Sequence, residues 1–375
     1  MNFKELANKS DKILFITHLA IGDFTYLQNY FKIFAIKYPH LKIDLLVDQG
    51  RGKSLLRRWS SKNHDILFDW LKQSNIFRNV YKDTKSWWQF KDSLDILKKE
   101  KYPIVVSLAT LHADRYAKYA KMILPTKGVI LGLIKKPKKY QLLSRFRFSR
   151  FDKSFDIASV SLPKQNFHIT YHYSEWFKNL FDINLEESEK SPFINIPKKW
   201  VIYGKLKHLK WGINSDKKGF QKSIFINSFA KNKKRCWSFD NVIKLVFQLK
   251  KINYFYDASF IINLLPAQYA KLKKYNDNYA TQKIFFFTAN KSFFQLPSVI
   301  APCDLVISVE TSVIHLASAL KVPVIALMRQ KNPEWYPYGG SYRIICTQKR
   351  SDWINKIKVE DVTEQTKSFL EQDIV

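Results

Sequence analysis

The chain has 375 residues, 46% of them hydrophobic, which is enough to form the cores of two domains. Lys and Arg number 63 against 32 Asp and Glu, so the formal net charge is +31 and an anionic partner is expected: a nucleic acid, an anionic membrane surface or an anionic substrate. The sequence has no long apolar run and its first segment is polar, so we expect neither a transmembrane helix nor a signal peptide. Its three cysteines lack metal-ligand spacing and are too few for a disulfide scaffold, so we expect a cytosolic protein.

The first elements form a strand–helix–strand unit. An apolar strand is predicted at Lys12–Thr17, followed by an exit loop at His18–Phe24, a helix from about Thr25 to Lys37 and a second strand at Lys42–Val47. Asp23 in the exit loop has two interpretations. It caps the helix, as Asp commonly does, or it is a general base at the carboxyl end of the strand.

The rest of the N-terminal half continues this alternation. We predict helices around His64–Gln73 and Trp88–Lys101, strands at Ile104–Leu108 and Gly128–Leu133, and a long helix from Phe167 to about Phe181. From residue 186 to 218 the sequence becomes polar and contains two prolines, which indicates a linker between domains.

Positive charge is concentrated in residues 135–153, called the basic stretch below. Its basic residues are Lys135, Lys136, Lys138, Lys139, Arg145, Arg147, Arg150 and Lys153. A solvated loop, a nucleic-acid patch and a platform for an anionic lipid or phosphorylated sugar are competing interpretations. A coding bias toward lysine is a further explanation of the charge. We expect contact with an acceptor or a membrane.

The C-terminal half contains a second set of alternating elements. Strands are predicted at Ser223–Asn227, Ala258–Leu264, Lys283–Phe287, Val322–Leu327 and Ile344–Thr347, with helices at Phe239–Lys250 and Ile354–Leu370. The loop Ser228–Trp237 is basic, and Arg235 in it could bind a diphosphate, although a solvated charge run is the alternative. Gln268 follows the second of these strands.

The most informative stretch is Asp304–Pro337. Leu305–Ile307 is a short buried strand, Ser308–Ser312 is a polar turn, and Val313–Leu320 has helical spacing of its apolar residues. In parallel sheets ligands bind at the carboxyl ends of strands, where a helix N-terminus attracts phosphate. This turn is therefore a candidate phosphate site.

This stretch resembles the signature of the glycosyltransferase family that contains the ADP-heptose:lipopolysaccharide heptosyltransferases. The family pattern Asp-Thr-Gly-x-x-His-Leu-Ala-Ala-Ala-Leu-Gly-x-Pro reads ETSVIHLASALKVP at 310–323. Its Pro-x-x-Trp-x-Pro corresponds to PEWYP at 333–337, which has one residue between Pro and Trp. Glu310 and Ser312 replace the family's Asp and Gly. The family's opening motif is matched by Ala20–Asp23 and Tyr38-Pro39, and its basic residue before a Trp by Arg235.

The resemblance implies an α/β chain of the GT-B fold, in which two Rossmann-like βαβ domains face a central cleft. We expect an N-terminal acceptor-binding domain at 1–190, a linker at 191–218, a C-terminal nucleotide-sugar-binding domain at 219–352 and a terminal helix at 353–375. The implied activity is inverting transfer of a sugar, heptose from ADP-heptose, onto the inner core of a lipopolysaccharide or lipooligosaccharide.

The same resemblance implies a role for individual residues, with Asp23 as the general base. The donor-binding residues implied are Arg235, Gln268, Glu310, Thr311, Ser312 and His315. The acceptor-binding residues expected are Lys135, Lys136, Lys138, Lys139, Arg145 and Arg147. No metal is expected, and the partners are the nucleotide sugar, an anionic lipid A-core acceptor and the inner face of a bacterial inner membrane, without nucleic acid. A different nucleotide sugar, a non-catalytic relative and a basic nucleic-acid-associated protein remain alternatives.

Overall fold

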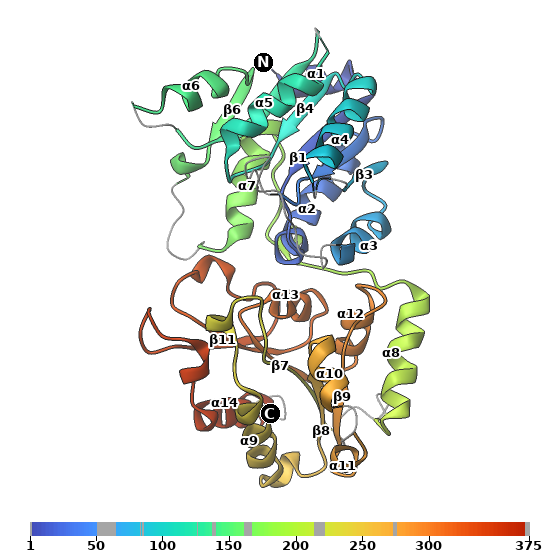
Figure 1. The fold of residues 1–375 in the computed structure, drawn as a ribbon, viewed down its shortest axis with the longest axis vertical. Helices are drawn as coiled ribbons and strands as arrows, with labels where there is room; N and C mark the ends of the chain where they lie inside the picture. The colour runs from blue at the N-terminus through green and yellow to red at the C-terminus, as the bar shows by residue number, and fades with distance from the viewer. Residues whose placement is uncertain are drawn as a thin grey trace. The chain divides into compact units, whose positions relative to one another are not determined.

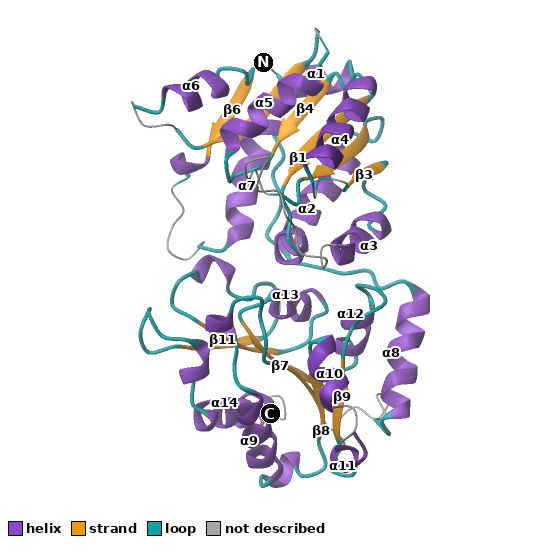
Figure 2. Cartoon of the chain, in the orientation of Figure 1, coloured by secondary structure: helices purple, strands orange, loops and turns teal. Residues whose placement is uncertain are grey.

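The computed structural model describes residues 2–50, 65–82, 84, 86–125, 127–136, 140–160, 167–213, 222–272 and 276–371. The chain divides into two compact units, Met1–Lys190 (unit 1) and Ser191–Val375 (unit 2) (Figure 1). Each unit is a parallel sheet covered by helices on both faces, as the alternation of strands and helices predicts (Figure 2).

The sheet of unit 1 has the strand order β3-β2-β1-β4-β5-β6, with all neighbours parallel. Its strands are β1 (Lys12–Thr17), β2 (Lys42–Val47), β3 (Asn79–Tyr81), β4 (Ile104–Ser107), β5 (Val129–Ile134) and β6 (Lys153–Asp156). The order reverses between β1 and β4, whose register pairs Ile13 with Ile104. In such sheets the reversal opens a crevice for ligands at the carboxyl ends of the two strands.

Two helical layers cover this sheet because β1 is apolar on both faces. The helices of unit 1 are α1 (Phe3–Asn8), α2 (Ile21–Lys37), α3 (Asp65–Gln73), α4 (Trp87–Lys99), α5 (Ala113–Ile123), α6 (Leu142–Phe148) and α7 (Ile169–Phe181). Leu14 and Ile16 pack with α4 and α5 on one face. On the other face Phe15 contacts Phe31 and Phe34 of α2 and Phe181 of α7 edge-on. The two layers bury β1 from Ile13 to Thr17 and thereby fix the loop that leaves it.

Unit 2 repeats the topology in the order β12-β11-β10-β7-β8-β9, again parallel throughout. Its strands are β7 (Ser223–Asn227), β8 (Ser259–Asn263), β9 (Ile284–Phe287), β10 (Leu305–Val309), β11 (Val324–Met328) and β12 (Tyr342–Cys346). Its α-helices are α8 (Lys198–Lys210), α9 (Phe239–Lys250), α10 (Pro266–Leu272), α11 (Asn276–Ala280), α12 (Gln295–Ile300), α13 (Ser312–Ala319) and α14 (Val359–Glu371). The order reverses between β7 and β10.

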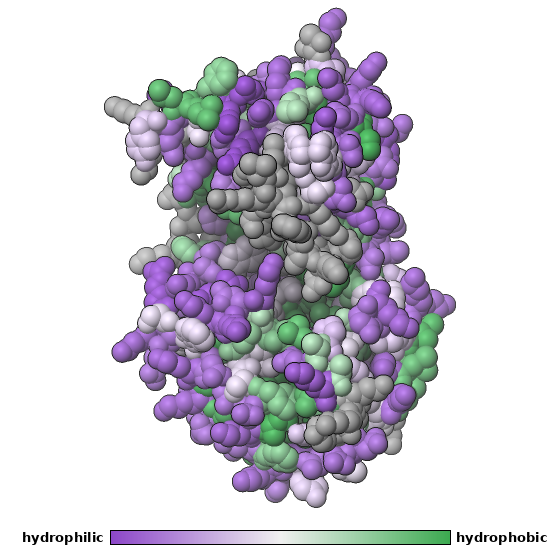
Figure 3. Space-filling model, in the orientation of Figure 1, coloured by the Kyte–Doolittle hydropathy of each residue, from purple (hydrophilic) through white to green (hydrophobic). Residues whose placement is uncertain are grey.

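Several elements differ from the sequence predictions. α2 begins at Ile21, so Asp23 lies in the first helical turn rather than in the exit loop. The basic stretch contains α6 and ends at Lys153, the first residue of β6. The expected linker contains α8, which packs against α12 within unit 2. Figure 3 shows hydrophobic side chains on the surface over α8. In sequence α8 resembles a polar linker because its lysines alternate with apolar residues that are exposed, so the pattern is not that of an ordinary amphipathic helix.

Candidate active site

A buried polar network joins the carboxyl ends of three strands of unit 2. The side-chain amide of Asn227, the last residue of β7, donates to Ser308 Oγ and Thr311 Oγ1, both at 3.1 Å. Asn263, the last residue of β8, donates to Asn227 Oδ1 at 3.0 Å. Thr311 Oγ1 in turn accepts from the backbone N–H of Val313 at 3.3 Å and caps α13. The network fixes the N-terminus of α13 at the point where the strand order reverses.

Glu310, between β10 and α13, is the centre of a cluster of charged side chains. Its Oε2 accepts from Arg329 Nε at 3.2 Å, and its Oε1 accepts from Asn332 Nδ2 at 3.3 Å. Arg235 Nε lies 3.4 Å from Oε1. The side chains of Glu310 and Arg329 are only 6% and 7% exposed, so each charge depends on the other. The predicted donor residue Glu310 therefore holds two guanidinium groups in place.

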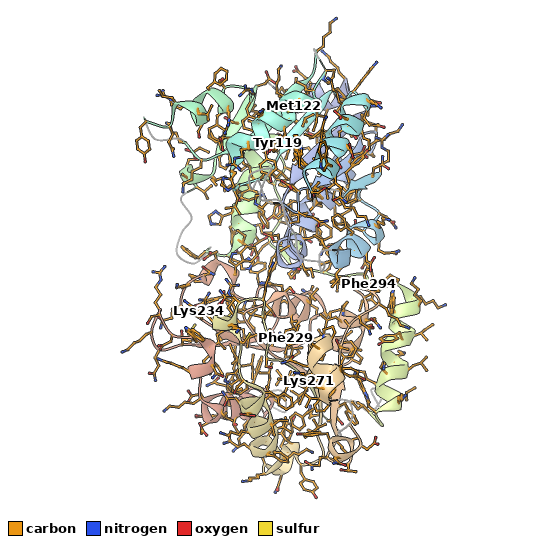
Figure 4. The ribbon with its side chains drawn as sticks, viewed as in Figure 1. Tyr119, Met122, Phe229, Lys234, Lys271 and Phe294 are labelled. Atoms are coloured by element: carbon orange, nitrogen blue, oxygen red, sulfur yellow. The ribbon has the colours of Figure 1, made fainter. Side chains whose placement is uncertain are left out.

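Arg235 lies in a short 3-10 helix, η6 (Lys233–Arg235), in the loop between β7 and α9. The loop is closed by a 2.8 Å bond from Trp237 N to Ser228 O, and the buried Trp237 ring donates to Ile357 O at 3.0 Å. Figure 4 labels Lys234 in the same loop. The Arg235 side chain is 35% exposed, so its guanidinium has N–H groups available for an anion such as a phosphate.

His315 and Ser312 both lie on α13. His315 is buried, and its ring meets the Trp335 ring edge-on with centroids 5.8 Å apart. Burial lowers the pKa of His315 to about 3, so its imidazole is neutral at physiological pH. Ser312 is the first residue of the helix and is half-buried. The predicted residues Glu310, Thr311, Ser312 and His315 are thus brought together by one turn and one helix.

Gln268 lies apart from this cluster in its contacts. It is exposed at the start of α10, beyond the carboxyl end of β8, and its Oε1 accepts from the backbone N–H of Leu265 at 3.1 Å. The amide therefore caps its own helix. Its predicted contact with a nucleotide ribose stays a prediction.

In unit 1 the corresponding reversal point holds Asp23. Its Oδ2 accepts from the backbone N–H of Ala20 at 2.8 Å, and its Oδ1 accepts from the hydroxyl of Tyr173 on α7 at 3.4 Å. Burial, reinforced by the charge of Asp23, raises the pKa of Tyr173 well above 10. The hydroxyl therefore stays protonated and donates a hydrogen bond to the carboxylate. Across the reversal, His18 Nε2 lies 3.5 Å from Thr110 Oγ1. These two hydrogen bonds hold the half-buried Asp23 carboxylate in one orientation.

The described residues of the basic stretch include a helix, α6, as well as loop residues. Lys135, Lys136 and Arg145 are exposed, whereas Arg147 forms a 2.6 Å ion pair with Asp114 of α5. Lys138 and Lys139 lie outside the described residues. Among the apolar side chains around α6, the highly exposed ones are Tyr140, Leu142, Leu143 and Phe146. Positive charge and exposed apolar surface therefore occur together here.

Several contributing residues were not predicted from the sequence. Arg329 and Asn332 follow β11, and Asn227 and Asn263 end their strands. A polar residue that ends an apolar strand was an available signal for both asparagines. Tyr173 gave no local signal, because its contact with Asp23 spans 150 positions. In the part of the chain that the structure describes, no three His, Cys, Asp or Glu side chains are grouped so as to hold a metal ion.

Comparisons with known proteins place these features in context. Residues 130–363 match the family model described as glycosyltransferase family 9 (heptosyltransferase). No curated protein matches the chain in sequence.

Among solved structures, the chain is similar to a glycosyl transferase family 9 protein from Veillonella parvula, with a TM-score of 0.69 and 14% identity over 96% of this chain and 97% of that one. It is similar to E. coli ADP-heptose lps heptosyltransferase II, with a TM-score of 0.66 and 14% identity over 97% of this chain and all of that one. For E. coli heptosyltransferase WaaC with ADP-2-deoxy-2-fluoro heptose the TM-score is 0.63, with 15% identity over 96% and 99% of the two chains. These likenesses confirm the predicted GT-B fold.

Proposed function

The chain belongs to glycosyltransferase family 9, the heptosyltransferase family, and on that premise we propose that it transfers a heptose from ADP-heptose to the inner core of a lipopolysaccharide or lipooligosaccharide. The observation that carries the proposal is the cluster of Arg235, Glu310 and Arg329 beside the capped N-terminus of α13. This arrangement suits a nucleoside diphosphate, because cationic side chains and backbone N–H groups converge at the carboxyl ends of β7 and β10. Two of the similar E. coli structures are described with ADP or an ADP-heptose analogue.

The residues of the cluster have distinct proposed roles toward the donor. Arg235 binds the diphosphate, while the backbone N–H groups at Thr311 and Ser312 face its oxygens. These groups stabilise the negative charge that develops on the departing ADP. Neutral His315 supplies a hydrogen bond to the sugar donor. Gln268 contacts the ribose after it gives up its hydrogen bond with the backbone N–H of Leu265.

Asp23 is proposed as the general base of a single inverting displacement. Its carboxylate accepts the proton of the acceptor hydroxyl as that oxygen forms a bond to the anomeric carbon and the bond to ADP breaks. The bonds from Ala20 N–H and the Tyr173 hydroxyl orient the carboxylate. Tyr173 is therefore a positioning residue.

We assign the anionic acceptor to the basic stretch of unit 1. Lys135, Lys136 and Arg145 are exposed and can bind phosphates of a lipid A core, together with the predicted Lys138 and Lys139. Arg147, already paired with Asp114, contributes mainly to the position of α6. Contact with such a lipid places the enzyme on the cytoplasmic face of the inner membrane. No helix within the described residues is long and apolar enough to cross a membrane.

A transfer assay tests the proposal directly. Purified enzyme is incubated with radiolabelled ADP-heptose and a lipid A-core acceptor that lacks heptose, and the labelled lipid is counted. UDP-sugars serve as competing donors, and thermal unfolding with each nucleotide reports binding, since a ligand at 100 times its Kd stabilises by about 2.7 kcal/mol. Transfer from ADP-heptose supports the proposal. Transfer or stabilisation with a UDP-sugar alone would favour the alternative donor, and salt-sensitive binding to an oligonucleotide without transfer would favour the nucleic-acid alternative.

A further inference from the structure

Helix α8 of unit 2 is held against its neighbour α12 by an unusually close contact. A Cβ atom at Gly204 would lie 2.1 Å from the carbonyl oxygen of Ser298, so only glycine allows this approach. One turn further on, the buried His208 ring donates from Nε2 to Val299 O at 3.0 Å. The inner face of α8 is therefore defined by two small or polar anchors, Gly204 and His208, which fix the rotation of the helix about its axis.

The face that this rotation turns outward is apolar. Ile202, Leu206 and Leu209, spaced at i, i+4 and i+7, are 49%, 60% and 62% exposed and form one stripe, here called the α8 strip. Exposed lysines border the strip on both sides: Lys198, Lys199, Lys205 and Lys210. Figure 3 shows the hydrophobic surface over α8 with hydrophilic residues around it. An ordinary surface helix has the opposite arrangement, with its apolar stripe facing the core.

We propose that the α8 strip and its lysines form a docking surface for an anionic lipid bilayer. Helices that lie in the membrane interface combine an apolar face that enters the acyl boundary with lysines that meet anionic headgroups. The lysine border of α8 is complementary in charge to such headgroups, and each lysine near the surface strengthens binding by about fivefold at low salt. The strip supplies the apolar contact that lysines alone lack.

A second copy of the chain fits this surface poorly. A two-fold interface through α8 would bring the lysine border of one copy against that of the other, in a protein whose net charge is already +31. The α8 strip belongs to unit 2 and the basic stretch to unit 1, and the role of the strip does not depend on which sugar the enzyme transfers. It adds an apolar anchor in unit 2 to a membrane contact proposed on other grounds.

Vesicle sedimentation with the full chain tests the proposal. The triple variant Ile202→Asn, Leu206→Asn, Leu209→Asn is compared with wild type on vesicles of phosphatidylglycerol and phosphatidylcholine and on phosphatidylcholine alone. We expect at least about 30-fold weaker binding of the variant to anionic vesicles, from the lost apolar contact. A matched control replaces Phe247, Tyr256 and Tyr342, exposed aromatic residues elsewhere on unit 2, by Asn and should bind like wild type.

Three further measurements separate the possible outcomes. Unchanged thermal unfolding and ADP binding show that the α8 strip variant is folded. A second variant, in which Gln replaces Lys198, Lys199, Lys205 and Lys210, measures the contribution of positive charge to vesicle binding without removing apolar groups. A variant substituted at Lys135, Lys136 and Arg145 measures the contribution of the basic stretch to vesicle binding separately from that of α8. Vesicle binding by the α8 strip variant equal to wild type refutes the proposal. A wild-type dimer that becomes monomeric in this variant, with vesicle binding unchanged, would identify the surface as a contact between copies instead.

Discussion

The substitution Glu310→Gln removes a buried negative charge while it keeps the shape of the side chain. In the wild type this carboxylate accepts from Arg329 Nε at 3.2 Å and from Asn332 Nδ2 at 3.3 Å, and the Arg329 side chain is 7% exposed. Breaking a buried ion pair by removing one partner costs about 3–5 kcal/mol, because the remaining charge is left uncompensated. Gln retains one acceptor oxygen, so we expect a loss near the lower value, about 3 kcal/mol.

This loss should be visible as a change in unfolding. For a unit of the size of Ser191–Val375, about 3 kcal/mol corresponds to a decrease in Tm of roughly 6–12 °C. Urea and thermal unfolding followed by circular dichroism give the free energy and the midpoint. The control Glu364→Gln, an exposed carboxylate on α14, should change stability by less than about 0.5 kcal/mol.

A double variant identifies the cause. When Arg329→Met is added to Glu310→Gln, no buried charge of this pair is left unbalanced, and much of the lost stability should return. A Glu310→Gln variant within about 1 kcal/mol of wild type would refute the reasoning, since Arg329 would then be stabilised by something other than this carboxylate. A double variant less stable than either single one would also contradict it.

Three other substitutions test the site. Asp23→Asn should keep the fold but lower turnover at least about 10²-fold in the transfer assay, because the general base is lost. The control Asp92→Asn, on the surface of α4, should leave turnover unchanged. Wild-type turnover in Asp23→Asn would refute the role of Asp23 as the general base. Arg235→Ala should weaken ADP binding by roughly 1.5–3 kcal/mol in calorimetry, and Lys234→Ala, at an exposed position of the same loop, is the control. Unchanged ADP binding in Arg235→Ala would show that Arg235 is a solvated charge and does not bind the diphosphate. Because the pKa of His315 is lowered to about 3, the unfolded chain binds its proton first as pH falls, so the free energy of unfolding should decrease from about pH 6.5 toward 3. His315→Asn should flatten this decrease, and an identical pH profile would contradict the buried neutral imidazole.

The sequence by itself determined the family and the fold class, and much of the strand framework. β1, β2 and β7 have the bounds predicted for them, because strands buried on both faces appear as mainly apolar segments, interrupted in β2 by the buried Asp44. The turn Glu310–Ser312 followed by α13 was also predicted, since capping residues and helical spacing are local signals. In this protein local patterns were sufficient wherever both faces of an element are buried.

Tertiary structure decided what the polar side chains contact. The partners of Glu310 come from two separate loops, before α9 and after β11. Tyr173, on α7, contacts Asp23 across 150 positions of the chain. Such pairings depend on the strand order, which places distant carboxyl ends side by side, and spacing along the chain does not encode it. The outward apolar face of α8 likewise results from the contact between Gly204 and Ser298, since the rotation of a helix is set by the surface it packs against.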